Sequence, residues 1–260
     1  MDVAAKQTPL LATREFPISR TNHRFVLPAG EQSKPLHGKR TIDLILALLI
    51  GVLTIPIQLV GLVVSAVAFR SFPIFSQQRL GLDGQLFTFF KIRSLPASTA
   101  AEAPKHDLSV VQNTAAGRFL RKTHLDELLQ FWSVVKGDMS IVGPRPEMVG
   151  LSETYDPEFV RLRTKVLPGI TGLWQISEAN EGLIGDAPGY DLYYLKNRSL
   201  RLDFWIMART AQKMAGRPVD FGQLDPARAA VFGEQTAVLT IDIRDQSDES
   251  AGGLLAQNRM

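Results

Sequence analysis

The chain has 260 residues, enough to form one sizeable core with appendages. It contains no cysteine, which excludes disulfides, thiolate metal sites and a cysteine nucleophile. A zinc site is not expected either, because the four histidines (His23, His37, His106 and His124) lack metal-ligand spacing. The formal charge of +3 suits anionic lipids or phosphorylated substrates. Nucleic-acid binding is not expected, since no recognised module pattern accompanies the basic residues.

The two ends of the chain differ in character from the middle. Residues 1–38 are polar and proline-containing without sustained periodicity, which predicts a mobile N-terminal arm. The first 15 residues have no long apolar core, so they do not resemble a secretory signal peptide. Residues 216–260 form a C-terminal extension with one strand-like run, 238–243, and a polar tail. The main folded unit is therefore expected between these ends, over residues 39–215.

Residues 44–69 form an apolar run of 26 residues without a charge. As one helix it would be about 39 Å long, enough to cross a hydrocarbon core of about 30 Å. Pro56 divides the run into halves of 12 and 13 residues, because proline removes an internal hydrogen bond and clashes with the preceding turn. Basic residues flank both ends of the run (Arg24, Lys34, Lys39, Arg40, Arg70 and Arg79). Since such flanks stay on the cytoplasmic side, we expect a re-entrant helix-break-helix over about 41–70. A kinked spanning helix is the alternative.

The next segments combine strand and helix patterns. Residues 75–93 predict a β-hairpin with Asp83-Gly84 as its turn, and residues 96–117 predict a loop. Residues 121–137 predict an amphipathic helix with its apolar positions at helical spacing: Leu125, Leu128, Leu129, Trp132 and Val135. Thr123 is its expected N-cap, and Lys136 and Gly137 close it. Asp126 and Glu127 would then lie in the first turn, away from the apolar face.

Downstream, an apolar stretch over 139–142 leads into a rigid turn over 143–146. We expect a polar helix over 147–165, a loop leading into a strand over 168–177, and an amphipathic helix over 199–215. The fold class is therefore α+β, with a short β-hairpin and amphipathic helices.

Asp126 and Glu127 are the first candidates for chemistry. Acids at a helix start commonly complement the helix dipole, worth about 0.3–1 kcal/mol each. Here Arg118, Arg121 and Lys122 precede them, and a helix N-terminus is itself an anion site. Carboxylates beside arginines can organise Mg²⁺ and a diphosphate together, and one carboxylate can attack phosphorus.

Further basic residues could bind phosphate. Arg145 lies between two prolines that restrict the guanidinium, which suits bidentate phosphate recognition, although an exposed arginine in a tight turn has the same pattern. Lys91 and Arg93, at the end of the predicted hairpin, are either solvated strand residues or a further phosphate clamp.

Five ordered stretches resemble the monotopic phosphoglycosyl transferases, the bacterial sugar transferases that start undecaprenyl-linked glycan assembly. They are KRTIDLILALL (39–49), SQQRLGLDGQLFTFFKIRSL (76–95), GRFLRKTHLDELLQFWSVVKGDMSIVGPRPE (117–147), PGITGLWQIS (168–177) and YDLYYLKNRSLRLD (190–203). The resemblance implies a re-entrant membrane helix with a small catalytic domain on the cytoplasmic face of the bacterial inner membrane. It also implies transfer of a sugar phosphate from a UDP-sugar to polyprenyl phosphate with release of UMP, requiring Mg²⁺. The pathway would make exopolysaccharide, capsule, O-antigen or another glycoconjugate.

The resemblance also assigns roles to residues. Asp126 would be the nucleophile that forms an aspartyl phosphosugar, and Glu127 would bind Mg²⁺ and help to activate the acceptor. Phosphates would be held by Arg121 and Arg145, and also by Lys91, Arg93 and Arg118. The expected partners are the UDP-sugar, the polyprenyl phosphate, membrane lipids and a second copy of the chain in a homodimer.

The chain departs from the family pattern at four positions. Ile55 stands where Ser is usual, Leu129 where Pro is usual, Ser133 in place of Asn and Leu167 in place of Lys. Two rival functions remain: a catalytically weak membrane scaffold for polysaccharide machinery, and a membrane-anchored phosphate-ester hydrolase. UMP release and a lipid product would exclude both.

Overall fold

The structure is a computed structural model that describes residues 36–99 and 114–222. Most of the predicted N-terminal arm (residues 1–35), most of the predicted loop and the strand-like run over 238–243 lie outside the described residues. Within the described part, helices and two small sheets combine as expected for an α+β fold.

Two apolar helices open the fold: α1 (Lys39–Leu53) and α2 (Ile55–Phe69). They meet at Thr54 with a bend of 60°. Pro56 lies in the first turn of α2, where its missing N–H is tolerated. Among the described residues no single helix is long and apolar enough to cross a membrane, but the bent pair qualifies by combined length and composition. The predicted break in the run is therefore confirmed, and its re-entrant placement stays a prediction.

Strands β1 (Ile74–Leu80) and β2 (Leu86–Ile92) form the predicted antiparallel hairpin. Asp83 and Gly84 in the short 3-10 turn η1 (Leu82–Gly84) have positive φ angles of 51° and 75°. Asp-Gly accepts this left-handed backbone, and such turns match the twist of the paired strands. The predicted turn residues are thus confirmed.

The single helix predicted over 121–137 is wrong. The structure has α3 (Ala115–Lys122), the 3-10 turn η3 (Leu125–Glu127) and α4 (Gln130–Lys136). His124 has a φ of 55°, so the chain changes direction between α3 and η3. Thr123 ends α3, and its hydroxyl donates to the Phe119 carbonyl at 2.7 Å instead of capping a new helix. Helix α4 does end at Gly137, which adopts the left-handed conformation typical of a C-cap.

The predicted loop over 96–117 is also too long, because α3 already begins at Ala115. Thr114 caps this helix, since its hydroxyl accepts a hydrogen bond from the Gly117 amide at 3.0 Å.

A second, parallel sheet pairs β3 (Ser140–Val142) with β4 (Gly169–Thr171). The predicted polar helix over 147–165 is instead two short helices, α5 (Val149–Ser152) and α6 (Pro157–Arg163). After β4 the chain turns into α7 (Leu173–Ile176), η4 (Glu178–Glu181), η5 (Ile184–Asp186) and α8 (Gly189–Asn197). Helix α9 (Leu200–Met214), capped by Ser199, confirms the predicted amphipathic helix.

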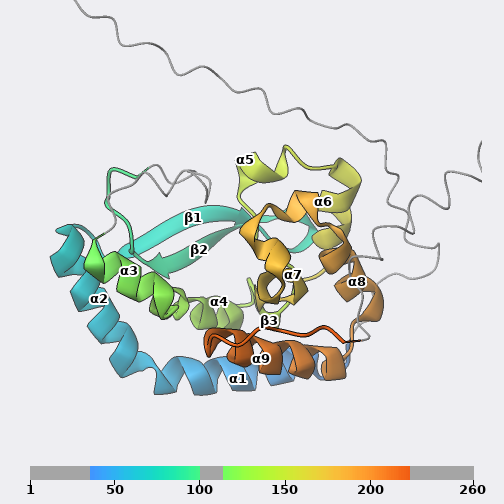
Figure 1. The fold of residues 1–260 in the computed structure, drawn as a ribbon, viewed down its shortest axis with the longest axis horizontal. Helices are drawn as coiled ribbons and strands as arrows, with labels where there is room; N and C mark the ends of the chain where they lie inside the picture. The colour runs from blue at the N-terminus through green and yellow to red at the C-terminus, as the bar shows by residue number, and fades with distance from the viewer. Residues whose placement is uncertain (1–35, 100–113, 223–260) are drawn as a thin grey trace, which may run out of the picture.

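Figure 1 shows α1 and α9 along one edge of the fold, with the β1–β2 hairpin on the other side of α3 and α4. The main core lies between these layers and includes Phe89, Val134, Met139, Val142 and Ile206. Ala47 of α1 belongs to the same core, while the rest of α1 and α2 exposes a series of large apolar side chains: Ile45, Leu48, Leu49, Val52, Leu53, Leu59, Val60, Val63 and Val67. An apolar surface of this kind is typical of contact with a membrane or a partner.

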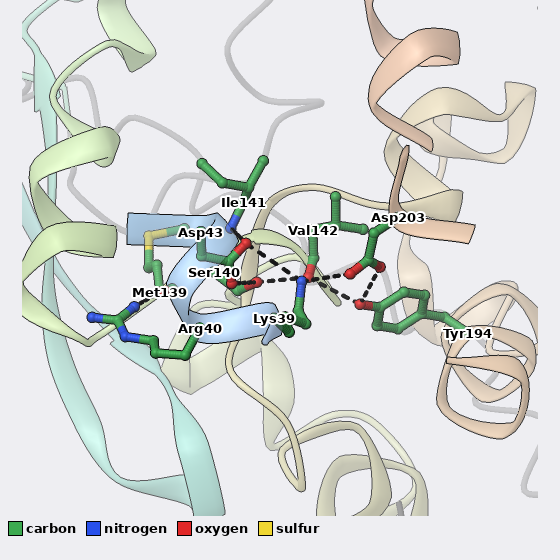
Figure 2. A network of polar contacts seen from close by, with 9 residues as sticks. All are labelled: Lys39, Arg40, Asp43, Met139, Ser140, Ile141, Val142, Tyr194 and Asp203. Carbon is green, nitrogen blue, oxygen red and sulfur yellow. Dashed lines mark hydrogen bonds and ion pairs between the residues drawn. The ribbon is translucent and has the colours of Figure 1, made fainter. Parts of the chain in front are cut away.

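A buried polar network holds the start of α1 against the rest of the fold (Figure 2). Asp43 accepts hydrogen bonds from the Ser140 hydroxyl at 2.7 Å and from the Ile141 amide at 3.3 Å. Lys39 forms an ion pair with Asp203 of α9 at 2.7 Å, and the Tyr194 hydroxyl donates to the same carboxylate at 2.9 Å. Because these groups satisfy one another, α1 is fixed to β3, α8 and α9.

Candidate active site

Asp126 and Glu127 lie in η3, at the corner between α3 and α4. The sequence pattern predicted that Asp126 lies in the first turn of one long helix, away from its apolar face. In the structure Asp126 lies in η3 instead and is only 5% exposed. Burial raises the pKa of the Asp126 carboxyl, the Lys91 ammonium opposes this, and the Glu127 carboxylate adds to the increase. A carboxylate shielded from water is a stronger nucleophile than a solvated one, and the Lys91 charge favours the ionised form of Asp126.

Lys91 of β2 forms an ion pair with Glu127, with 2.5 Å between Nζ and Oε1. Burial alone would raise the pKa of Glu127, but the positive charges of Lys91 and Arg145 outweigh it and lower the pKa to about 2. Glu127 is therefore ionised at neutral pH. Lys91 is therefore an ion-paired residue rather than a solvated strand residue, and its role as a phosphate clamp stays a prediction.

The other side of Asp126 faces the segment that follows β2. The Ser94 hydroxyl donates to Asp126 Oδ2 at 3.4 Å, and Arg121 of α3 donates to the Ser94 carbonyl. Helix α3 approaches this carbonyl closely, because a Cβ at Gly117 would lie 2.3 Å from the Ser94 oxygen. Glycine at this position therefore allows α3 to bring Arg121 to the site.

Arg145 lies in the turn after β3, and its charge acts on both Glu127 and Arg79. Arg79 of β1 is buried and donates to the Pro146 carbonyl at 2.9 Å. Burial and the Arg145 charge lower the pKa of Arg79 to about 10, and Glu147, 3.8 Å away, opposes them. Arg79 therefore holds the Arg145 turn against the hairpin.

A second arginine, Arg163, also holds the turn that contains Arg145. Arg163 of α6 donates to the Arg145 carbonyl at 2.9 Å and forms a buried ion pair with Asp191 at 2.9 Å. The sequence patterns did not indicate Arg79, Glu147 or Arg163 as site residues. The available signal was that Arg79 and Glu147 fall inside two of the ordered family-like stretches.

Residues 35–217 match the profile of the family described as bacterial sugar transferase. The chain belongs to the bacterial sugar transferase family. Among its relatives, the UDP-galactose-lipid carrier transferase of Erwinia amylovora is 37% identical over 66% of this chain and 39% of its own length. The UDP-glucose:undecaprenyl-phosphate glucose-1-phosphate transferase of Klebsiella pneumoniae is 38% identical over 69% of this chain and 41% of its own length. The exopolysaccharide production protein ExoY of Sinorhizobium fredii is 34% identical over 74% of this chain and 92% of its own length.

The family assignment confirms the resemblance drawn from the five sequence stretches. The chain spans about two fifths of the length of the first two relatives and nearly all of ExoY.

In this member of the family the structure brings Lys91, Arg121, Asp126, Glu127 and Arg145 together through direct contacts or charge interactions. Arg121 reaches the site through the Ser94 carbonyl. Their chemical roles stay predictions.

Arg93 and Arg118 occupy different surroundings. Arg93 donates through Nε to the Phe72 carbonyl at 2.9 Å, and its own carbonyl accepts from the Ser65 hydroxyl at 2.7 Å. These bonds join the end of β2 to the chain leaving α2, which is a structural role. Arg118 lies on the exposed side of α3. Phosphate binding by either residue stays a prediction.

Asp126 and Glu127 can be compared with the ligands that the expected Mg²⁺ would need. Among the described residues, no group of three His, Asp or Glu side chains could enclose a metal ion. Mg²⁺ in transferases is commonly bound by one or two carboxylates together with substrate phosphates and water. The pair Asp126 and Glu127 fits a site of this kind, in which a bound diphosphate would supply the remaining metal ligands.

Proposed function

We propose that this chain transfers a sugar phosphate from a UDP-sugar to undecaprenyl phosphate and releases UMP. Membership of the sugar transferase family supports the proposal, as does the name of the Klebsiella relative, which states this type of reaction. The observation that carries it is the buried Asp126 carboxyl beside an ionised Glu127, with Lys91 and Arg145 as neighbouring cations.

The proposed reaction has two steps at one phosphorus atom. A carboxylate oxygen of Asp126 attacks the phosphorus that carries the sugar, and the bond from this phosphorus to the UMP oxygen breaks. The product is an aspartyl phosphosugar. An oxygen of undecaprenyl phosphate then attacks the same phosphorus, and the Asp126 carboxylate leaves. Covalent capture allows two bulky anions to react in turn instead of meeting in one step.

The surrounding cations would favour both steps. Phosphoryl transfer depends mainly on positioning and on neutralising charge at the phosphate oxygens. Lys91 and Arg145 place positive charge beside the carboxylates, and bound Mg²⁺ would neutralise further diphosphate charge. A carboxylate with a pKa of about 2 is a weak base, so the surroundings of Glu127 favour metal binding over proton removal from the acceptor.

The direct test supplies the enzyme with a panel of UDP-sugars, undecaprenyl phosphate and Mg²⁺. We expect one or a few UDP-sugars to give equal amounts of UMP and sugar-diphosphate lipid. Release of free sugar phosphate without lipid product would indicate the hydrolase, and no UMP with any sugar would indicate the scaffold. A parallel series without Mg²⁺ tests the metal requirement.

We further propose that α1 and α2 form a re-entrant hairpin in the inner membrane, with the catalytic domain on the cytoplasmic face. Because the chain has no cysteine, His37→Cys and Ala97→Cys each introduce a unique label site, one before α1 and one after β2. In intact spheroplasts, a membrane-impermeant thiol reagent should label neither site, and both should react after permeabilisation. Labelling of one site alone from the outside would show that the helix pair spans the membrane.

Lys91→Met should move the acidic side of the pH–activity profile to higher pH. Burial already raises the pKa of Asp126, and the Lys91 charge opposes that increase. Without Lys91 the nucleophile keeps its proton to a higher pH, so kcat/KM for UMP release should begin to fall at a higher pH than in the wild type. Lys165→Met, which removes an exposed lysine paired with Asp83, is the control and should leave the profile unchanged. An unshifted profile in Lys91→Met would contradict the proposed electrostatic role.

A further inference from the structure

The start of α2, just after the bend, contains a buried amide, Gln58, in a largely apolar segment. Proline at position 56 has no N–H, so the carbonyl four residues earlier, at Val52, lacks its normal helical donor. Backbone groups at such a break need other partners, since little water reaches an apolar environment. Gln58 is only 5% exposed and lies two residues after the proline.

Side chains supply hydrogen bonds across the break. Gln58 Nε2 donates to the Gly51 carbonyl at 3.0 Å and to Thr54 Oγ1 at 2.8 Å. The Thr54 hydroxyl in turn donates to the Ile50 carbonyl at 2.7 Å. Ile55, directly before the proline, has no polar side-chain group for this purpose.

The bond from Gln58 to Gly51 requires the bend. In a straight helix, residues seven positions apart are separated by about 10.5 Å along the axis, beyond the reach of a glutamine side chain to that carbonyl. The bond from Gln58 to Thr54 spans four residues and is compatible with a straight helix. The Gly51 bond therefore stabilises the bent form specifically.

The same amide contacts the catalytic part of the fold. Trp132 of α4 donates from Nε1 to Gln58 Oε1 at 3.0 Å. The Trp132 ring also lies against Gly51, where an added Cβ would be 3.6 Å from the ring. Helix α4 follows Asp126 and Glu127 after only two residues. One side chain thus joins the two sides of the break to the helix that directly follows the two acids.

We propose that Gln58 and Trp132 form a latch that fixes the bend between α1 and α2 and sets its position relative to Asp126. A buried amide is costly unless its partners are present, and Gln58 makes all three bonds only when the helices are bent and α4 is docked. Both are positioning residues: they act on the reaction by fixing where the membrane helices lie relative to the site. Pro56 removes a backbone donor, and the latch then selects the bent form.

The test measures the bend directly, without reference to activity. Spin labels at Thr41→Cys and Val67→Cys would lie on exposed positions of α1 and α2, in a chain without native cysteine. The backbones of these residues should be about 34 Å apart with a 60° bend and about 39 Å apart in a straight helix, from a rise of about 1.5 Å per residue. In lipid nanodiscs, Gln58→Leu should move the distance distribution toward the longer value.

Further variants separate the effect of the latch on the bend from the effect of Pro56. Pro56→Ala alone should keep the short distance, because Gln58 still reaches Gly51, whereas Pro56→Ala combined with Gln58→Leu should give the long distance. Trp132→Phe keeps a ring in place but removes the N–H, and should broaden the distribution. Trp205→Phe, the same chemical change on α9, is the control and should match the wild type. An unchanged distribution in Gln58→Leu, or complete straightening by Pro56→Ala alone, overturns the proposal.

The consequence for catalysis rests on the proposed function and is measured separately. Gln58→Leu should lower transfer to undecaprenyl phosphate by about tenfold, while single-turnover UMP release from the UDP-sugar changes little, because in the proposed function the lipid acceptor, unlike the UDP-sugar, reaches the site from the membrane in which α1 and α2 lie. If Gln58→Leu does not fold, Trp132→Phe provides both measurements. A wild type that forms no lipid product would contradict the proposed function, but the distance measurements would still decide the latch. Equal loss of both steps in a folded variant would contradict its role as a positioning device.

Discussion

Asp126→Asn should abolish both UMP release and lipid product, with a loss of at least about 10³-fold in kcat. Asparagine keeps the shape of the side chain but lacks the negative oxygen that would attack phosphorus. Wild-type enzyme incubated with its UDP-sugar and no acceptor should gain the mass of one phosphosugar, and peptide mass spectrometry should locate it on Asp126. The variant should show no such adduct.

The matched control for this change is Asp83→Asn, on the exposed hairpin turn. Asparagine tolerates the left-handed backbone that Asp83 adopts, so the turn and the activity should both persist. An adduct on any other residue, or substantial activity in Asp126→Asn, would be incompatible with Asp126 as the nucleophile. Retained adduct formation in Glu127→Gln, with slower transfer to lipid, would agree with a metal-binding role for Glu127.

Arg163→Met should lower the free energy of unfolding by about 3–5 kcal/mol, because it leaves the buried Asp191 carboxylate without its partner. The two side chains are each 3% exposed and pair at 2.9 Å. Burial raises the pKa of Asp191 and Arg163 opposes this, so in the variant the carboxyl should take up a proton more readily. The loss of stability should therefore shrink as the pH is lowered. Denaturant unfolding at two pH values measures both effects.

Two further variants show whether Arg163 also supports the active site. Arg163→Lys keeps the charge, but an ammonium cannot reproduce the forked geometry that binds Asp191 and the Arg145 carbonyl together. We expect a smaller loss of stability and a clear loss of activity. Arg161→Met removes an exposed ion pair with Glu158 and should change stability by less than about 1 kcal/mol. Equal effects of Arg161→Met and Arg163→Met would contradict the importance of burial.

The sequence alone determined the features that depend on neighbouring residues. Asp83-Gly84 indicated the hairpin turn, because few other residue pairs accept two consecutive positive φ angles. The helical pattern over 199–215 indicated α9, and in the structure the Ser199 hydroxyl accepts a hydrogen bond from the Leu202 amide at the start of this helix. Pro56 indicated the break in the apolar run, since proline acts within its own turn. The five ordered stretches indicated the family, and with it Asp126, Glu127 and Arg145 as candidates.

Only the tertiary structure decided how these residues meet. Helical spacing predicted one helix over 121–137, but contacts with β2 and the packing of α3 impose a corner at His124 that buries Asp126. Lys91 and Glu127 are 36 residues apart, and Gln58 and Trp132 are 74 apart, so no local pattern could pair them. The pKa values of Asp126 and Glu127 likewise depend on residues that are distant in the sequence. A carboxyl group's acidity depends on burial and on the charges that long-range folding places beside it, and periodicity in a sequence records neither.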